Sequence, residues 1–147
     1  MTATPVDFGA RFDSLFAYHA TEKSLDPVLL KAQAIAESNL DPKAVSAVGA
    51  KGLAQFMDKT WREIAPEGAS PFNPDDAIAA QAKYLDRLLN AFDNDSEKAF
   101  AAYNWGMGNL RTALSKHGET WKDHLPKETQ DYLTRIARIA NSLRTTV

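Results

Sequence analysis

Helical periodicity, and the residues that interrupt it, constrain the fold of this chain most strongly. Two Asx-Pro pairs, Asp26-Pro27 and Asn73-Pro74, each combine an N-cap side chain with a proline at the first helical position. Apolar residues at helical spacing follow both pairs, and strand-like alternation is not evident apart from room for one small hairpin. We therefore predict an all-α chain rather than a sheet protein.

The same patterns set the expected helix boundaries. Phe8, Phe12, Leu15 and Phe16 indicate a first helix over about residues 6–20. An ordered loop is expected from Asn39 to Lys51. The other predicted helices run from Pro27 to near Asn39, from Gly52 to Ile64, from Pro74 through Leu89, from a Ser96 cap to Gly106 and Gly108, from Leu110 to Lys116, and from Pro126 through Leu143.

Length and composition exclude several classes of protein. The 147 residues suit one domain, so we expect residues 1–147 to form a single compact helical domain. Without cysteine there is no disulfide framework and no thiolate metal site. A net charge of -2 without a long basic block argues against a nucleic-acid partner. No apolar run approaches the roughly 20 residues that span a bilayer, so stable membrane insertion is not expected.

The segment AIAESNLDP, from Ala34 to Pro42, contains the best candidate for chemistry. On a helix, Glu37 extends the face of Leu30 and Ala34. If that face is buried, desolvation raises the carboxyl pKa, and the nearby helix C-terminus acts in the same direction. A carboxyl that keeps its proton near neutral pH serves as a general acid. The alternative is a surface glutamate, or one that pairs with Lys43.

Four blocks in order surround this acid. They are E-S followed by Asp41-Pro42, the stretch GAKGLAQFM from Gly49 to Met57, the stretch AYNWG from Ala102 to Gly106, and P-x-E-T-x-x-Y from Pro126 to Tyr132. In this combination the chain resembles the soluble-lytic-transglycosylase (SLT) type of lytic transglycosylase, with a goose-lysozyme-like fold. The resemblance covers about residues 25–140. Any single block is weak, but four in order are specific.

Three positions depart from the family pattern. Ala54 stands where the family usually has Met, and Asp58 where it usually has Pro. The N-P of the first block reads Asp41-Pro42. None of these changes falls on Glu37, so they concern loop shape and the fit of the substrate more than the class of reaction.

The resemblance implies one acid/base and six substrate-binding residues. Glu37 is the implied acid/base, and the others are Ser46, Gln55, Met57, Tyr103, Asn104 and Glu128. Ser46 is expected to hold the N-acetyl group or a water. Tyr103 with Asn104 is expected opposite the acid, where it steadies the reacting sugar. Glu128 is expected at the edge of the cleft.

The implied reaction cleaves the MurNAc-β-1,4-GlcNAc bond of peptidoglycan and leaves 1,6-anhydro-MurNAc ends. One carboxylate suffices if the 2-acetamido group of the substrate supplies the second function. A hydrolase on the same fold, like goose-type lysozymes, is the first alternative. A non-catalytic wall-binding or virion module is the second, and a helical DNA-binding protein is the third.

Other functional residues are not indicated. His19, His117 and His124 are scattered and form no metal-binding motif, so we expect neither a metal nor a cofactor. Trp61, Trp105 and Trp121 are interpreted as packing residues.

The N-terminal residues lack a basic segment followed by an apolar one. The sequence therefore predicts cytoplasmic synthesis without a signal peptide and action on the bacterial wall. Such a chain could reach the wall in three ways: by release during phage lysis, by carriage in a virion, or through a secretion machine. Nothing in the sequence requires more than a monomer.

Overall fold

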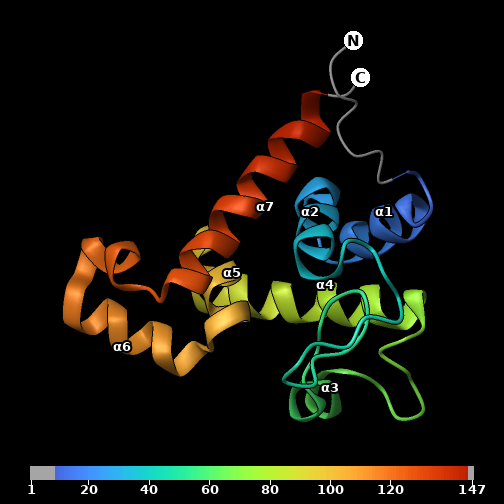
Figure 1. Cartoon of the computed structure of the whole chain (residues 1–147), viewed down its shortest axis with the longest axis horizontal. Coiled ribbons are helices and arrows are strands. Elements are labelled where there is room, and N and C mark those ends of the chain that lie inside the picture. The colour runs from blue at the N-terminus through green and yellow to red at the C-terminus, as the bar shows by residue number, and fades with distance from the viewer. Residues whose placement is uncertain (1–8, 146–147) are drawn as a thin grey trace.

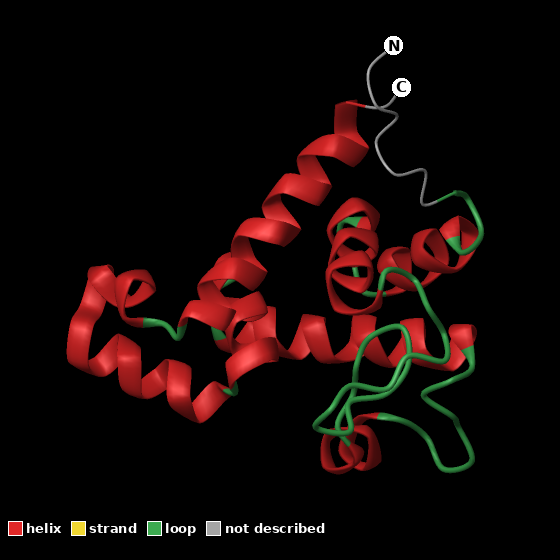
Figure 2. Cartoon of the chain, viewed as in Figure 1, coloured by secondary structure: helices red, strands yellow, loops and turns green. Residues whose placement is uncertain are grey.

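In the computed structural model, which describes residues 9–145, the chain is a bundle of short helices with no regular strand in that range. Figure 2 shows that the longest non-helical stretches lie before and after α3. The helices are α1 Asp13–Glu22, α2 Pro27–Ser38, α3 Asp58–Ile64, α4 Pro74–Ala91, α5 Ser96–Trp105, α6 Met107–His117, the 3₁₀ helix η1 Gly118–His124 and α7 Lys127–Thr145. The predicted all-α class is confirmed.

Asx caps begin three of these helices. Asp26 accepts a hydrogen bond from the backbone nitrogen of Val28 at the start of α2, and Pro27 occupies the first helical position, as predicted. Asn73 caps α4 in the same way by accepting from the Asp76 nitrogen. At α5 the prediction was off by one residue, because Asp95 rather than Ser96 is the cap.

Three predicted boundaries were wrong. Residues 52–57 form turns rather than the first half of a helix, and Gln55 there has a φ of 52°, which a helix does not allow. Gly108 lies within α6 instead of ending α5, because Gly106, with a φ of 102°, already separates the two helices. The expected first helix begins later, at Asp13, and Phe8 lies outside the described residues.

The possible small hairpin is reduced to two isolated antiparallel bridges. Lys51 pairs with Val45 on one side and with Phe56 on the other. These bridges fold residues 44–57 into the tight double turn drawn in teal near α3 in Figure 1. Gly52 makes the double turn possible, because a Cβ there would overlap the backbone carbonyl of Pro71. The loop before α4 thus closes directly onto the double turn.

Helix α4 crosses the centre of the molecule, with α1 and α2 on one side and α3 on the other (Figure 1). The long helix α7 packs along α2, so that the last described helix covers one of the first. At one end of this pair Arg144 bonds the Asp26 carboxylate. Buried apolar residues from every helix except α3 form the main core, and α6 contributes Leu110 to it. Phe56, Ile64 and Ala80 form a smaller second cluster with Ala54, and Tyr84 and Tyr103 pack against both clusters.

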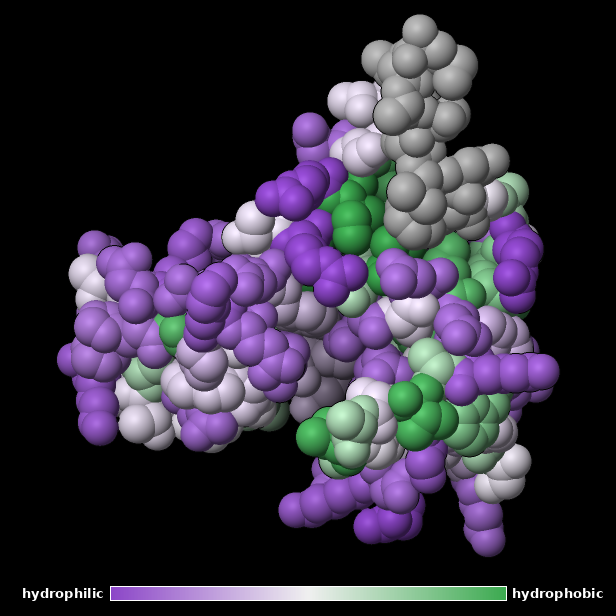
Figure 3. Space-filling model, viewed as in Figure 1, coloured by the Kyte–Doolittle hydropathy of each residue, from purple (hydrophilic) through white to green (hydrophobic). Residues whose placement is uncertain are grey.

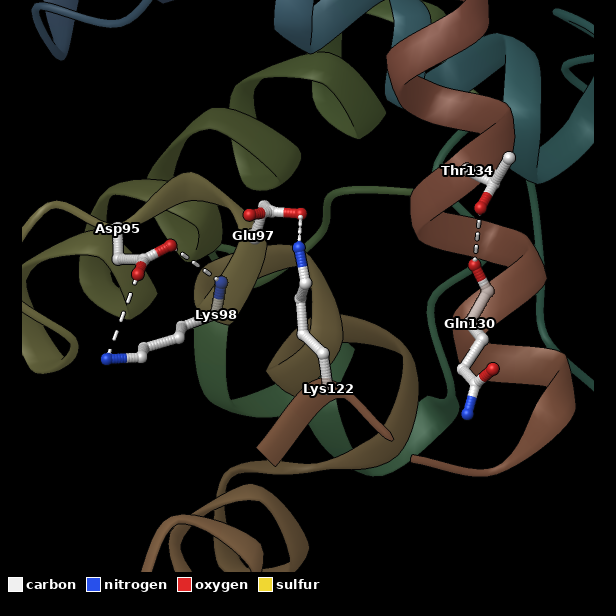
Figure 4. A network of polar contacts seen from close by, with 6 residues as sticks. All are labelled: Asp95, Glu97, Lys98, Lys122, Gln130 and Thr134. Atoms are coloured by element: carbon white, nitrogen blue, oxygen red, sulfur yellow. Dashed lines mark hydrogen bonds and ion pairs between the residues drawn. The ribbon is translucent and has the colours of Figure 1, made fainter. Parts of the chain in front are cut away.

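The part that carries α6 and η1 projects to one side and is largely hydrophilic in Figure 3. One salt bridge among the described residues ties it to the rest of the molecule. Lys122 of η1 contacts Glu97 of α5 at 2.7 Å (Figure 4). Figure 4 also shows a bond within α7, where the Thr134 hydroxyl donates to the Gln130 carbonyl. His117 and His124 were expected to be scattered, but their rings stack 3.5 Å apart. No group of three metal-ligating side chains occurs within residues 9–145.

Candidate active site

A cleft of about 810 Å³ opens between the C-terminal end of α2, the double turn of residues 44–57, the end of α5 and the start of α7. All seven residues that the resemblance singled out line this one cleft. The complete lining is Ala36, Glu37, Ser46, Val48, Ala50, Gln55, Met57, Tyr103, Asn104, Glu128, Asp131, Tyr132 and Arg135. Residues that span almost a hundred positions of sequence thus face one space.

Glu37 is the penultimate residue of α2, and its carboxyl group stands in the wall of the cleft. The helix ends directly after it, since Asn39 takes a left-handed φ of 55°. Burial raises the pKa of Glu37 to about 7, although a hydrogen bond from Tyr132 and the charge of Arg135 act against this shift. The charge of Glu128 raises the same pKa further. The acid is therefore half protonated close to neutral pH.

The alternative interpretation of Glu37 as a plain surface glutamate does not fit this environment. Its carboxylate is bonded to Tyr132, not to Lys43. Lys43 instead donates through its backbone nitrogen to Asp41, the turn chemistry that an Asx-Pro pair predicts.

Tyr132 holds Glu37 from the facing helix. Its hydroxyl donates to Glu37 Oε2 at 2.8 Å and accepts from Gln33 Nε2 at 2.9 Å. Burial and the nearby charge of Glu37 raise the pKa of Tyr132 well above its ordinary value, so the phenol keeps its proton. Figure 1 shows α7, the helix that carries Tyr132, running alongside α2.

Two buried glutamines extend this contact into the core. Gln81 of α4 donates through Nε2 to Gln33 Oε1 at 3.0 Å and to the Leu30 carbonyl at 2.9 Å. Both glutamines are fully buried. Gln81 Oε1 has no hydrogen-bond partner among residues 9–145, so the inner end of the network holds a desolvated oxygen.

The double turn presents Ser46, Gln55 and Met57 to the cleft, and the first two also maintain the turn itself. Ser46 accepts from the Ala50 nitrogen through its Oγ at 3.0 Å. The Gln55 amide donates to the Gly52 carbonyl at 3.0 Å and to the Ala44 carbonyl at 3.3 Å. Gln55 therefore finds its partners in the turn, and not on the helix face where the sequence placed it.

The rim of the cleft along the double turn is apolar. Val48 and Met57 line it there with exposed apolar side chains, and Val48 is 76% exposed. Figure 3 shows apolar surface gathered over these loops beside α3. The opposite rim, on α7, is charged and carries Glu128, Asp131 and Arg135. A ligand in the cleft would thus lie between an apolar and a charged wall.

Tyr103 and Asn104 reach the cleft from the end of α5. The Tyr103 hydroxyl donates to the Ala54 carbonyl at 3.0 Å, and its ring packs against Phe56 and Tyr84. Burial and the charge of Glu37 raise the pKa of Tyr103 well above its ordinary value. Asn104 accepts a hydrogen bond from buried Thr129 of α7 at 2.8 Å, which orients its amide.

Sequence reasoning missed part of this site. Tyr132 ends the quoted P-x-E-T-x-x-Y block, yet no role was assigned to it. Gln33 lies four residues before Glu37 on the same helix face, and a polar residue on a face expected to be buried was a usable signal. Gln81 and Arg135 gave no signal, since only the packing of α4 and α7 on α2 brings them there.

Comparison with known proteins agrees with this geometry. Residues 14–126 match the family described as the Transglycosylase SLT domain. The membrane-bound lytic murein transglycosylase F of Maricaulis maris is 33% identical over 125 residues, which cover 77% of this chain and 27% of that protein. The peptidoglycan transglycosylase gp16 of Escherichia phage T7 is 31% identical over 137 residues, which cover 89% of this chain and 10% of that protein.

The solved structure of the 70-kDa soluble lytic transglycosylase of Escherichia coli superposes with a TM-score of 0.85 and 28% identity, covering 93% of this chain and 24% of that one. A complex of the 70-kDa soluble lytic transglycosylase with bulgecin A gives a TM-score of 0.86 at 27% identity, with 93% and 24% covered. The chain thus spans about a quarter or less of the length of these proteins. By the family match over residues 14–126, this chain belongs to the transglycosylase SLT domain family.

Proposed function

We propose that residues 1–147 act as one catalytic domain that cleaves the MurNAc-β-1,4-GlcNAc bond of peptidoglycan and leaves 1,6-anhydro-MurNAc ends. The observation that carries this proposal is a carboxyl group, Glu37, with a pKa of about 7 in the wall of a long cleft. Family membership and the lytic murein transglycosylases among the relatives support the same substrate.

In the first step Glu37, in its neutral form, gives its proton to the glycosidic oxygen. The C1–O bond of the muramoyl sugar breaks, and the GlcNAc hydroxyl leaves. The carbonyl oxygen of the 2-acetamido group bonds to C1, so that no protein nucleophile is required. Glu128 and Asp131 also line the cleft, from the start of α7 rather than from α2.

In the second step Glu37, now a carboxylate, takes the proton of the C6 hydroxyl of the same sugar. That oxygen attacks C1, and the bond from the acetamido oxygen to C1 breaks. The product carries the 1,6-anhydro ring, and the acid has regained its proton. The pKa near neutrality suits both halves of this cycle, because one group must act first as an acid and then as a base.

The remaining cleft residues are proposed to bind the glycan. Ser46, Gln55 and Met57 present the double turn to the sugars, and Tyr103 and Asn104 face the acid from α5. Glu128 bounds the cleft on α7. Because the Tyr103 hydroxyl already donates to Ala54, we propose that its oxygen and ring, rather than its proton, contact the sugar.

A wall substrate implies a route to the wall. No helix within the described part of the chain is long and apolar enough to cross a membrane. We propose that a phage lysis system, a virion or a secretion machine delivers the domain, and the phage T7 relative supports the phage route. We propose no cofactor, no nucleic-acid partner and a monomeric state.

Mass spectrometry of muropeptides released from purified peptidoglycan tests the function. Wild type is expected to yield anhydro-muramoyl ends, and Glu37→Gln none. Reducing ends, heavier by one water, would make the protein a hydrolase. Release by neither protein would favour a non-catalytic wall-binding module, and equal release by both would remove Glu37 from the mechanism.

A further inference from the structure

The strongest feature that the proposed reaction leaves unused is the buried row of polar groups behind Glu37. It runs from the Leu30 carbonyl through Gln81 and Gln33 to Tyr132, and each link is a hydrogen bond of 2.8 to 3.0 Å. Three helices, α2, α4 and α7, each contribute a member. Burying such a row of polar groups costs free energy. The donor and acceptor at each link, and the contact with Glu37 at its end, indicate what the row does.

The direction of the row follows from its inner end. The Leu30 carbonyl can only accept, so Gln81 must turn its NH₂ group toward it. The same nitrogen lies 3.0 Å from the side chain of Gln33, which must therefore present its oxygen. The oxygen of Gln81 is left facing away, which accounts for the buried atom without a partner.

The orientation of Gln33 in turn fixes the orientation of the Tyr132 hydroxyl toward Glu37. With its oxygen turned to Gln81, Gln33 presents its NH₂ group to the oxygen of Tyr132. The phenol accepts this bond and has one hydrogen left, which points to Oε2 of Glu37 at 2.8 Å. A rotated hydroxyl would set its hydrogen against the NH₂ group of Gln33. The row thus leaves Tyr132 one orientation.

We propose that Gln33 and Gln81 are positioning residues that make Tyr132 a permanent donor to Oε2 of Glu37, so that the transferable proton of the acid resides on Oε1. The role of that proton rests on the function proposed above. The orientation of Tyr132 does not, because it follows from the hydrogen bonds alone.

Other charged and titratable groups act on the same carboxyl. From α7, Arg135 and Glu128 act on it with opposite signs, and Asp131 lines the same wall. From α5, Tyr103 faces it as a neutral phenol. None of these groups belongs to the glutamine row, so a change in the row can be separated from a change in the surrounding charge.

The test is a ¹³C NMR titration of the Glu37 carboxyl in the full chain. Gln33→Met keeps the length of the side chain and removes the amide, so Tyr132 is no longer held and donates less well. We expect the pKa of Glu37 to rise by about half a unit. Gln81→Met is expected to act in the same direction, because Gln33 is then free to flip and to accept from Tyr132.

A double-mutant cycle decides whether the row acts through Tyr132. In a Tyr132→Phe background, Gln33→Met is expected to cause no further shift. The matched control is Gln130→Met. Gln130 lies on α7, as Tyr132 does, but its amide bonds the Leu125 carbonyl and not Tyr132. This control should leave the Glu37 titration unchanged.

Equal shifts in both backgrounds, or no shift from Gln33→Met in a folded protein, would overturn the proposal. If one glutamine variant fails to fold, the other carries the same test. The titration needs no turnover. A chain that shows the shifts but releases no muropeptide would therefore support the row and refute the proposed function.

Discussion

The hydroxyl of Tyr103 donates a hydrogen bond to the backbone carbonyl of Ala54, 3.0 Å away, and so joins the end of α5 to the double turn. This bond connects two walls of the cleft that are 49 residues apart in sequence. It also places the side chain of position 54, where the family usually has Met, inside the second apolar cluster. The shape of the cleft therefore depends on a hydrogen bond to the backbone of Ala54, a residue that does not itself line the cleft.

Removing this bond should cost stability. Tyr103→Phe leaves the Ala54 carbonyl without its partner, and the free energy of unfolding is expected to fall by about 1 to 2 kcal/mol. Urea unfolding measures this. Tyr84→Phe is the matched control, because Tyr84 packs in the same aromatic cluster and its hydroxyl has no hydrogen bond among residues 9–145. Equal losses in both variants would show that the hydroxyl of Tyr103 contributes nothing specific.

The stability of Glu37→Gln relative to wild type should depend on pH. The pKa of Glu37 is about 7 in the folded protein against an ordinary value of 4.5, so the contribution of this group is fully present below pH 4.5 and is lost as pH rises through 7. Glutamine does not ionise, so Glu37→Gln does not lose this stability as pH rises. We expect the variant to be more stable than wild type by about 2 to 3 kcal/mol at pH 8, and by little at pH 4.

Chemical unfolding at both pH values measures this difference. The exposed Glu67→Gln serves as control and should show no such dependence. A Glu37→Gln advantage that is the same at pH 4 and pH 8 would contradict a raised pKa.

The rate of muropeptide release should fall on the alkaline side of neutrality. The first step needs neutral Glu37, so above a pKa of about 7 the rate is expected to drop about tenfold per pH unit. Release is measured under substrate-limited conditions from pH 5 to 9, with circular dichroism at each pH to verify the fold. A rate that stays constant up to pH 9 would mean that Glu37 does not act as the general acid.

Thr129 should influence turnover without touching the substrate. It is buried and donates to Asn104 at 2.8 Å, so Thr129→Val keeps the shape of the side chain and frees the amide in the cleft. We expect muropeptide release to fall by about three- to tenfold, the effect of losing one oriented polar contact. Thr134→Val, an exposed substitution on the same helix, should leave release unchanged. Equal effects would assign the loss to α7 rather than to Asn104.

Gly52 should tolerate no side chain. It combines a φ of +79° with the close approach of Pro71, whose carbonyl a Cβ would overlap. Gly49 has a φ of +90° but open space around it. Gly49→Ala is therefore expected to cost about 1 kcal/mol of strain, and Gly52→Ala at least about 3 kcal/mol or the fold of the double turn. Thermal unfolding of the two variants would separate strain from overlap, and similar melting temperatures would contradict the close approach.

Local sequence signals were sufficient for most helices, but not for the double turn. The Asp26-Pro27 and Asn73-Pro74 caps act within one helical turn, so their effect can be read from neighbouring residues. The left-handed backbone of Gln55 cannot, because a hydrogen-bonding amide that reaches Ala44 and Gly52 stabilises it. Tertiary contacts therefore override an apparently helical pattern there.

The candidate site likewise has a part that the sequence predicted and a part that it could not. Family blocks placed the seven expected residues around one cleft, but the pattern could not supply what lies behind Glu37. Gln81 reaches Gln33 across 48 residues, and Tyr132 reaches Glu37 across 95. Periodicity assigns a residue to a face of its own helix and contains no information on which helix packs there.

The pairing of Glu37 with Tyr132 makes the acid dependent on the order in which the chain is synthesised. Glu37 leaves the ribosome before α7, whose residues 127–145 follow about ninety residues later. A nascent or prematurely ended chain that lacks α7 has the glutamate without Tyr132, Arg135 or the wall that buries it. Its carboxyl then faces water and titrates as any free glutamate does. The half-protonated form of Glu37 therefore exists only once α7 has been synthesised and has packed on α2.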